Sequence, residues 1–389
     1  MATKKIIPAT KPAAKQNYER IACVFQGGGA LGAYQVGAFK ALHEHGYHPN
    51  FLAGVSIGAI NAAIVAGNSP DKQIERLEEF WKTITPSAWS DYLYHFADID
   101  MIHHFHNRMG ATNSLLFGQT GFFEPRLTNP NLLEGATPDQ LSYYDTSPLR
   151  ETLTRLIDFD RINSREVTLS LGAVNITKGE LVYFNNQETK ITVDHVMASG
   201  ALPPAFPAVK IGDDYFWDGG IYGNTPLLAV LDALPLADTL CFMIDCFNLK
   251  GPLPTTMDQI EERQKDIKYG SHSRRNTSLH NTRQNLQAAI AFLGEKLSPE
   301  AKKDPDVKRI LELGNEKKFS LVHIIYQSTG FSHSFKDYNF ARAIVLRRFK
   351  HGYRDACAVL ENPQWEKESH TTLADSIYGL PDSYYQKNR

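Results

Sequence analysis

The feature that most constrains the fold is an alternation of short apolar runs with helical patterns near the start of the chain. The run IACVFQ (21–26) is rich in strand-forming residues, and the segment 30–46 after it has apolar residues at helical spacing. FLAGV (51–55) is a second short apolar run, followed by the small-residue helical pattern IGAINAAIVAG (57–67). Strand, helix, strand and helix in this order indicate a mainly parallel sheet with helices on both faces. The sequence therefore predicts an α/β fold.

Further apolar runs continue this pattern along the chain. EVTLSLGAVNI (166–176), TLCFMIDCF (239–247) and FSLVHIIYQ (319–327) each predict a buried strand. After Phe247 the composition changes, because residues 257–297 are polar and favour a helix. We expect three parts: a disordered tail (1–19), a main domain (20–250), and a C-terminal extension (251–389) of helical segments plus a strand that packs on the core.

The composition excludes several classes of protein. The chain of 389 residues has 41 Lys and Arg against 43 Asp and Glu, so no overall basic charge attracts nucleic acid. Four cysteines are too few for a disulfide scaffold, which favours a reducing, cytoplasmic location. The longest apolar run (53–67) is shorter than the roughly 18 residues of a membrane span. We expect a soluble protein with no transmembrane segment and no signal peptide.

The glycine cluster that ends the first apolar run raises the first question about function. Gly27, Gly29 and Gly32 have the G-x-G-x-x-G spacing of a dinucleotide-binding loop. Such a loop needs an acidic residue about 20 positions further on, yet there is no Asp or Glu between Glu44 and Asp71. Because the lysine of a P-loop is also missing, the sequence argues against a phosphate-binding role and against an oxidoreductase.

A second motif ends the second apolar run. Gly54, Ser56 and Gly58 form G-x-S-x-G between a predicted strand and a predicted helix, which is the setting of a nucleophile elbow. Acyl transfer to such a serine builds negative charge on the carbonyl oxygen, and backbone N–H groups can stabilise it. We therefore predict that the segment Gly27–Gly29 forms an oxyanion hole, and that Gly32 and Gly37 serve close packing.

Three ordered motifs, GGGALG (27–32), GVSIG (54–58) and DGG (218–220), resemble the pattern of the patatin-like phospholipase family. The segment VMASGALPPAFP (196–207) also resembles the helix and proline turn that precede the family's third motif. The resemblance covers roughly residues 20–250 and implies a patatin-type three-layer fold. It also implies that Asp218, supported by Gly219 and Gly220, replaces the usual His–Asp pair. The stretch after residue 250 resembles the extension of a bacterial patatin-like subgroup.

The implied activity is that of a lipid acyl hydrolase, a phospholipase A-like or lysophospholipase-like esterase. Ser56 and Asp218 would be its catalytic dyad, with no metal and no cofactor. The substrate would be a lipid or acyl ester, including one at a membrane surface. Leu31 stands where the family often has a basic residue, which removes one contact to a lipid phosphate. Two alternatives remain: an acyltransferase that uses the same acyl-enzyme, and an inactive regulatory homologue.

Other residues are weighed against simpler roles. His43, His45 and His48 match no common zinc spacing, so we expect structural roles for them. The histidines that could serve a Ser–His–Asp triad are His195, His323 and His333, and none follows a motif that fixes such a residue. The irregular, aromatic segment 87–144 is expected to wall or cover the acyl site.

Overall fold

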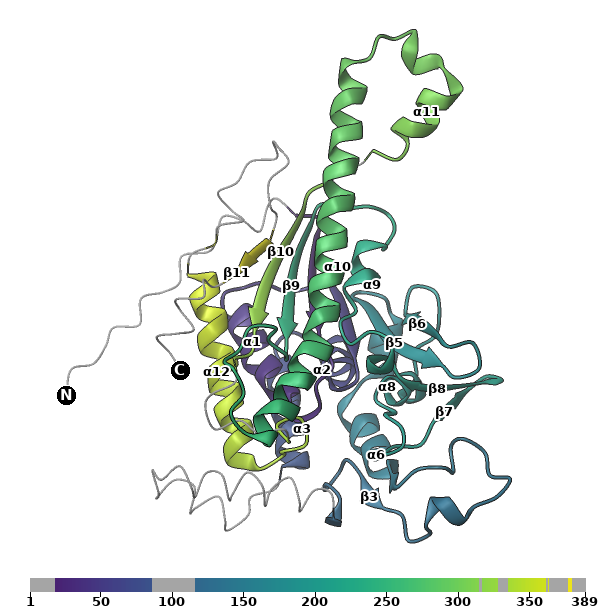
Figure 1. Cartoon of the computed structure of the whole chain (residues 1–389), viewed down its shortest axis with the longest axis vertical. Helices are drawn as coiled ribbons and strands as arrows, with labels where there is room; N and C mark the ends of the chain where they lie inside the picture. Colours follow the sequence, from purple (N-terminus) through teal and green to yellow (C-terminus); the bar gives the residue numbers. More distant parts are fainter. Residues whose placement is uncertain are drawn as a thin grey trace, which may run out of the picture.

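The computed structural model describes residues 18–85, 116–314, 317–327, 335–361, 363 and 377–379. A central sheet of nine strands dominates the described part of the chain (Figure 1). Its strands are β1 (Arg20–Phe25), β2 (Phe51–Val55), β5 (Thr168–Asn175), β6 (Glu180–Asn185), β7 (Val209–Ile211), β8 (Asp214–Asp218), β9 (Thr239–Asp245), β10 (Phe319–Ile325) and β11 (Ile377–Gly379). A separate short pair consists of β3 (Glu124–Pro125) and β4 (Tyr144–Asp145).

The strand order is β11-β10-β9-β1-β2-β5-β8-β7, and β6 also pairs with β5. Every pair from β11 to β5 is parallel. The pairs of β5 with β6, of β5 with β8, and of β8 with β7 are antiparallel. The predicted α/β class with a mainly parallel sheet is therefore confirmed.

Helices cover both faces of this sheet. The α-helices in the described part of the chain are α1 (Gly32–Glu44), α2 (Ile57–Ala66), α3 (Gln73–Ile84), α6 (Ser147–Leu156), α7 (Phe159–Asn163), α8 (Val193–Ser199), α9 (Leu227–Leu231), α10 (Met257–Lys296), α11 (Pro305–Leu311) and α12 (Arg342–Leu360). Because side chains alternate along a strand, Cys23 and Phe25 of β1 pack with α1, α2 and α12 on one face. Ala22 and Val24 pack with α9 on the other face. The structure thus has three layers.

The stretch after residue 250 contributes to the same sheet. β10 pairs with β9 over its full length, and β11 pairs with β10. Helix α12 lies against α1, and an added Cβ at Gly352 would stand 1.9 Å from the carbonyl oxygen of Tyr34. Gly37 makes the reciprocal contact, 1.9 Å from the carbonyl oxygen of Phe349. The two helix backbones therefore touch at a pair of glycines, and residues on both sides of position 250 share one core.

The far end of α10 projects from the body of the molecule together with α11 (Figure 1). Leu286 and Leu293 of this projecting part are 61% exposed. Within the described ranges, no helix is both long and apolar enough to cross a bilayer.

The aromatic segment 87–144 is described only from residue 116 onward. Phe122 and Phe123 are buried, and their rings lie 6.0 Å and 5.2 Å from the ring of Phe206. Phe117 is 76% exposed. The other aromatic residues of the predicted wall, Trp89, Tyr92, Tyr94, Phe96 and Phe105, lie outside the described residues, so this wall stays a prediction.

Candidate active site

Ser56 occupies the sharp turn between β2 and α2. Its backbone has φ 57° and ψ −129°, a conformation that is strained for a residue with a side chain. The flanking glycines make the turn possible, because an added Cβ at Gly54 would lie 2.4 Å from the carbonyl oxygen of Gly58. One at Gly58 would lie 2.2 Å from the carbonyl oxygen of Phe25. The spacing G-x-S-x-G thus has a steric cause, and the geometry is that of the predicted nucleophile elbow.

The backbone of this turn is held by Ser199, at the end of α8. The N–H of Ser56 lies 3.0 Å from the carbonyl oxygen and 3.1 Å from the hydroxyl of Ser199. The Ser199 hydroxyl in turn donates to the carbonyl oxygen of Gly172 on β5, at 2.6 Å. Ser199 is fully buried. Sequence reasoning missed this supporting role, although it had singled out the surrounding segment VMASGALPPAFP.

Asp218 ends β8, and the sheet itself brings this residue to Ser56. On β5, Gly172 pairs with Val55, the last residue of β2, and the next residue, Ala173, pairs with Asp218. Strands β2 and β8 therefore share one edge of β5 and meet end to end. Gly219 allows this close approach, because an added Cβ there would lie 2.5 Å from the carbonyl oxygen of Gly172.

The carboxyl group of Asp218 is only 2% exposed. Burial raises its pKa to about 6, while hydrogen bonds from the Ser56 hydroxyl and from the N–H of Gly220 act in the opposite direction. The Gly220 N–H lies 2.7 Å from Oδ1. A carboxylate with a raised pKa in contact with a serine hydroxyl has the properties of a general base.

The glycine turn, residues 27–31, lies beside Ser56. An added Cβ at Gly27 would stand 3.2 Å from the Cβ of Ser56 and 2.1 Å from Oδ1 of Asn224. The N–H of Gly27 donates to the carbonyl oxygen of Asn224 at 3.0 Å, and the Asn224 side chain donates back to the carbonyl oxygen of Gly27 at 2.8 Å. Gly27 is thus fixed next to Ser56, with its N–H already in use.

The next two glycines differ from Gly27. Among the residues that the structure describes, no acceptor faces the N–H of Gly28 or of Gly29. Gly29 has φ +55°, and an added Cβ there would lie 2.3 Å from the carbonyl oxygen of Asp337. The turn closes with a hydrogen bond from the N–H of Leu31 to the carbonyl oxygen of Gly28, at 3.1 Å. Gly28 and Gly29 therefore have donors available for a bound anion.

Gln26, directly before the turn, is fully buried and connects several elements. Its side-chain oxygen accepts from the N–H of Cys246 at 2.6 Å. Its amide nitrogen donates to the hydroxyls of Thr225 and of Ser273 on α10, both at 3.0 Å. The structure places Gln26 as a link between β1, β9 and α10.

Two tyrosines from the stretch after residue 250 lie within electrostatic range of the Asp218 carboxylate. Burial raises the pKa values of Tyr269 on α10 and of Tyr338, and the charges of Asp337 and Asp218 act in the same direction. Both tyrosines are therefore close enough to Asp218 to feel its charge. The surroundings of the site are built from both halves of the chain.

The histidines lie in other settings. His195 is buried, caps the start of α8 through Thr192, and packs on Phe184 at a ring distance of 4.6 Å. His323 lies in β10, which is three strands from β2 in the sheet, or about 14 Å at the usual strand spacing. His333 lies outside the described residues. Within the described ranges, no group of three or more His, Cys, Asp or Glu side chains is arranged to hold a metal ion.

Comparison with known protein families assigns the chain to one of them. The model of the family described as patatin-like phospholipase matches residues 23–231, which is more than half of the chain. The chain belongs to the patatin-like phospholipase family. A second family model, described as patatin phospholipase, matches residues 267–372 of this patatin-like chain.

Individual relatives of this patatin-like protein match over shorter stretches. The triacylglycerol lipase SDP1L of Arabidopsis thaliana is 34% identical over 67 residues, which is 17% of this chain and 8% of that protein. The uncharacterized protein YqhO of Bacillus subtilis (strain 168) is 35% identical over 79 residues, which is 20% of this chain and 26% of that protein. The chain thus matches about a quarter or less of the length of these relatives.

Two solved structures are similar to this patatin-like protein. VipD from Legionella pneumophila aligns with a TM-score of 0.38 and 18% identity, covering 88% of this chain and 67% of that chain. ExoU of Pseudomonas aeruginosa, in complex with SpcU, aligns with a TM-score of 0.29 and 15% identity, covering 76% and 68%.

Proposed function

We propose that this patatin-like protein is a serine hydrolase that cleaves fatty acyl esters of lipids, with Ser56 and Asp218 as its catalytic dyad. The observation that carries this proposal is the meeting of β2 and β8 on one edge of β5. There a strained serine turn lies beside a buried carboxylate whose pKa is raised by burial.

In this mechanism Asp218 takes the proton of the Ser56 hydroxyl while the oxygen attacks the ester carbonyl. The negative charge that forms on the carbonyl oxygen is stabilised by the N–H groups of Gly28 and Gly29. Asp218 then gives its proton to the departing alcohol, which leaves an acyl-enzyme on Ser56. Asp218 next takes a proton from a water molecule that attacks the acyl group, and the fatty acid is released as Ser56 recovers its proton.

The oxyanion role was predicted for Gly27, Gly28 and Gly29 together. We now propose it for the last two only, because the N–H of Gly27 already donates to Asn224. Gly27 would act instead by close approach, since a side chain there would collide with Asn224 and crowd Ser56.

The proposal also includes the class of substrate and the cellular compartment. Leu31 puts an apolar, buried side chain where the family often has a cation, which favours an ester group without a phosphate next to the carbonyl. The four cysteines, all described, are unpaired thiols. We therefore propose action in a reducing compartment such as the cytoplasm.

The test is a set of single variants assayed on one p-nitrophenyl ester and on a panel of neutral and phosphate-bearing lipids. Ser56→Ala and Asp218→Asn should each lower kcat by about 10³-fold or more, since members of a catalytic unit fail together. His195→Gln, which preserves a capping side chain at the start of α8, and His323→Gln should keep most of the activity. Exposed Ser271, on α10, provides the control Ser271→Ala.

Circular dichroism would show that each variant is folded, and a fluorophosphonate probe would report on the nucleophile. We expect labelling of the wild-type protein and none of Ser56→Ala. If a folded histidine variant were as inactive as Asp218→Asn, the proposed dyad would be wrong and the enzyme would use a Ser–His–Asp triad.

A further inference from the structure

A loop from the stretch after residue 250 contacts the glycine turn directly. This loop, residues 335–341, precedes α12. The carbonyl oxygen of Asp337 accepts the N–H of Ala30 at 2.8 Å. The same oxygen lies where a side chain on Gly29 would have to go. The backbone of the loop thus lies against the two glycines whose N–H groups are proposed to bind the oxyanion.

One side chain joins the loop to the turn. Arg348 of α12 is only 4% exposed. Its Nη1 donates to the carbonyl oxygen of Ala30 at 2.9 Å and to that of Asn339 at 3.1 Å, and its Nη2 donates to that of Lys336 at 2.6 Å. The guanidinium therefore bridges one carbonyl of the glycine turn and two of the loop. Its planar fork suits this task, and it stays charged even when buried.

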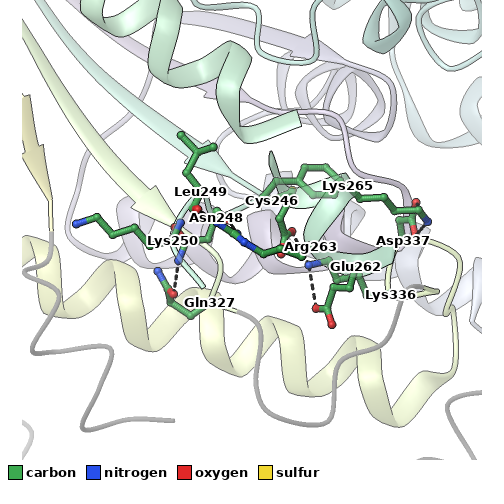
Figure 2. A network of polar contacts seen from close by, with 12 residues as sticks. Cys246, Asn248, Leu249, Lys250, Glu262, Arg263, Lys265, Gln327, Lys336 and Asp337 are labelled. Atoms are coloured by element: carbon green, nitrogen blue, oxygen red, sulfur yellow. Dashed lines mark hydrogen bonds and ion pairs between the residues drawn. The ribbon is translucent and has the colours of Figure 1, made fainter. Parts of the chain in front are cut away.

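Side chains of α10 also contact the loop (Figure 2). The buried ammonium of Lys336 lies 3.1 Å from Glu262 and 2.6 Å from Asp266. Lys265 pairs with both carboxylate oxygens of Asp337, at 2.8 Å and 3.0 Å. The contacts from α10 and from Arg348 together hold the loop against the turn.

Helix α12, which carries Arg348, is packed closely against α1. Four residues after Arg348, Gly352 makes the backbone contact with Tyr34 of α1 described above. The hydroxyl of Tyr34 also donates to Asp355, at 3.1 Å. Because α1 begins at Gly32, directly after the glycine turn, these contacts join α12 to the helix that continues from the turn.

We propose that Arg348 is a positioning residue for the oxyanion hole, and that it holds the N–H groups of Gly28 and Gly29 at the geometry the reaction requires. This inference rests on the proposed hydrolase function. A turn with several consecutive glycines has little conformational preference of its own, and donors must lie about 2.7–3.1 Å from the oxyanion to be effective. The contacts from Arg348 and Asp337 supply the missing constraint from outside the turn.

The first test is Arg348→Lys, with Arg347→Lys as its matched control. Lysine keeps the charge, but one ammonium cannot span the three carbonyl groups. Arg347 carries the same change one residue earlier, about 100° around the helix. We expect kcat of Arg348→Lys on a p-nitrophenyl ester to fall by about 10²-fold, as for a 1 Å misplacement in a site. KM should stay within about twofold, since ground-state binding is unchanged.

A second readout separates positioning from a loss of stability. A trifluoromethyl ketone with an acyl-like chain forms a tetrahedral adduct with the serine and places its oxyanion in the hole. Its affinity for Arg348→Lys should fall by the same factor as kcat/KM, because such an analogue follows the transition state. The affinity for the fatty acid product should not change. A folded Arg348→Lys with wild-type kcat and wild-type ketone affinity would overturn the inference.

A third measurement covers the case in which Arg348→Lys does not fold. Arg348→Ala leaves space for a guanidinium ion, so methylguanidinium in the buffer should raise kcat of the folded variant in a saturable way, whereas methylammonium should not. If neither variant folded even with guanidinium, Arg348 would be a folding residue and the inference would be wrong. Absence of hydrolysis by the wild-type protein would instead reject the proposed function.

Discussion

The two segments that flank the glycine turn hold it in different ways. On one side, the elbow at Ser56 and the Asn224 loop approach it so closely that only glycine fits at positions 27, 54 and 58. On the other side, the loop 335–341 and Arg348 reach it through hydrogen bonds to backbone carbonyl oxygens. The first arrangement restricts which residues the turn can contain. The second restricts the turn at position 29, where the carbonyl oxygen of Asp337 leaves no room for a side chain, but the hydrogen bonds from Arg348 place no limit on side chains.

This difference explains why the steric contacts are visible as a motif and the contact with Arg348 is not. A steric limit appears in the sequence as a glycine at a fixed spacing, so the elbow and the turn can be read locally. Every residue has a backbone carbonyl oxygen, so the amino-acid sequence of the turn does not indicate that Arg348 binds the carbonyl oxygen of Ala30. A single sequence can thus reveal the steric contacts of a functional element and give no sign of its hydrogen-bond partners.

The largest effect should come from the sterically limited side. An added Cβ at Gly28 would lie 2.8 Å from the Cβ of Cys246, an atom that follows its backbone and cannot easily move. Gly28→Ala should displace at least one N–H donor and lower kcat by about 10²–10³-fold. At Gly223 an added Cβ would meet only Leu181, at an ordinary 3.5 Å, which makes Gly223→Ala the control. Equal kcat values for these two variants would assign the turn to packing alone.

A second expected effect is the pH dependence of the dyad. Asp218 must be ionised to act as a base, and its pKa is raised to about 6 by burial. Therefore kcat/KM should be flat above this pH and fall about tenfold per unit below it. An apparent pKa near 4, measured on an ester that does not titrate, would contradict this.

The same shift affects stability with a definite sign. The folded state holds the Asp218 proton more tightly than the unfolded state does, so the group lowers the free energy of unfolding as the pH rises from about 4 to 6. At pH 7 the loss is about 3 kcal/mol, from about two pKa units at 1.36 kcal/mol each. Asp218→Asn should reduce this loss, measured by urea unfolding at pH 4 and pH 7.

The smallest of these effects should come from the contact between α12, which carries Arg348, and α1. In Gly352→Ala the new Cβ would lie 1.9 Å from the carbonyl oxygen of Tyr34, so α12 must shift away from α1. Alanine in place of glycine gains about 1 kcal/mol of helix propensity, while overpacking costs about 1–3 kcal/mol. We expect a net loss of up to about 2 kcal/mol in urea unfolding relative to Gly223→Ala. A more stable Gly352→Ala would show that this helix contact is loose.

Much of the fold could be predicted because its elements are periodic and locally bounded. The runs 51–55 and 57–67 correspond to β2 and α2, and the run 319–327 contains β10. The antiparallel pairing of β8 with β5 was not predicted, since YFW is too short a run to reveal a partner or direction. This pairing brings Asp218 to the end of β2. The sequence therefore identified the residue but not its place in the fold.

The site shows the same limit. Ser56 and Asp218 could be named from G-x-S-x-G and DGG, because both motifs reflect local backbone geometry. The use of the Gly27 N–H by Asn224 could not be foreseen, because the two residues are brought together only by the folded sheet. Ser199, Gln26 and Arg348 also act through contacts between distant segments, for which a single sequence carries no pattern.

The shared edge of β5 has a dynamic consequence. Ser56 and Asp218 are both placed by neighbouring positions, Gly172 and Ala173, of one strand inside the sheet. We therefore expect Ser56 and Asp218 to be carried along together when the sheet bends or its outer strands fluctuate. Thermal motion of β10, β11 or the projecting end of α10 should leave the separation of Ser56 and Asp218 almost constant.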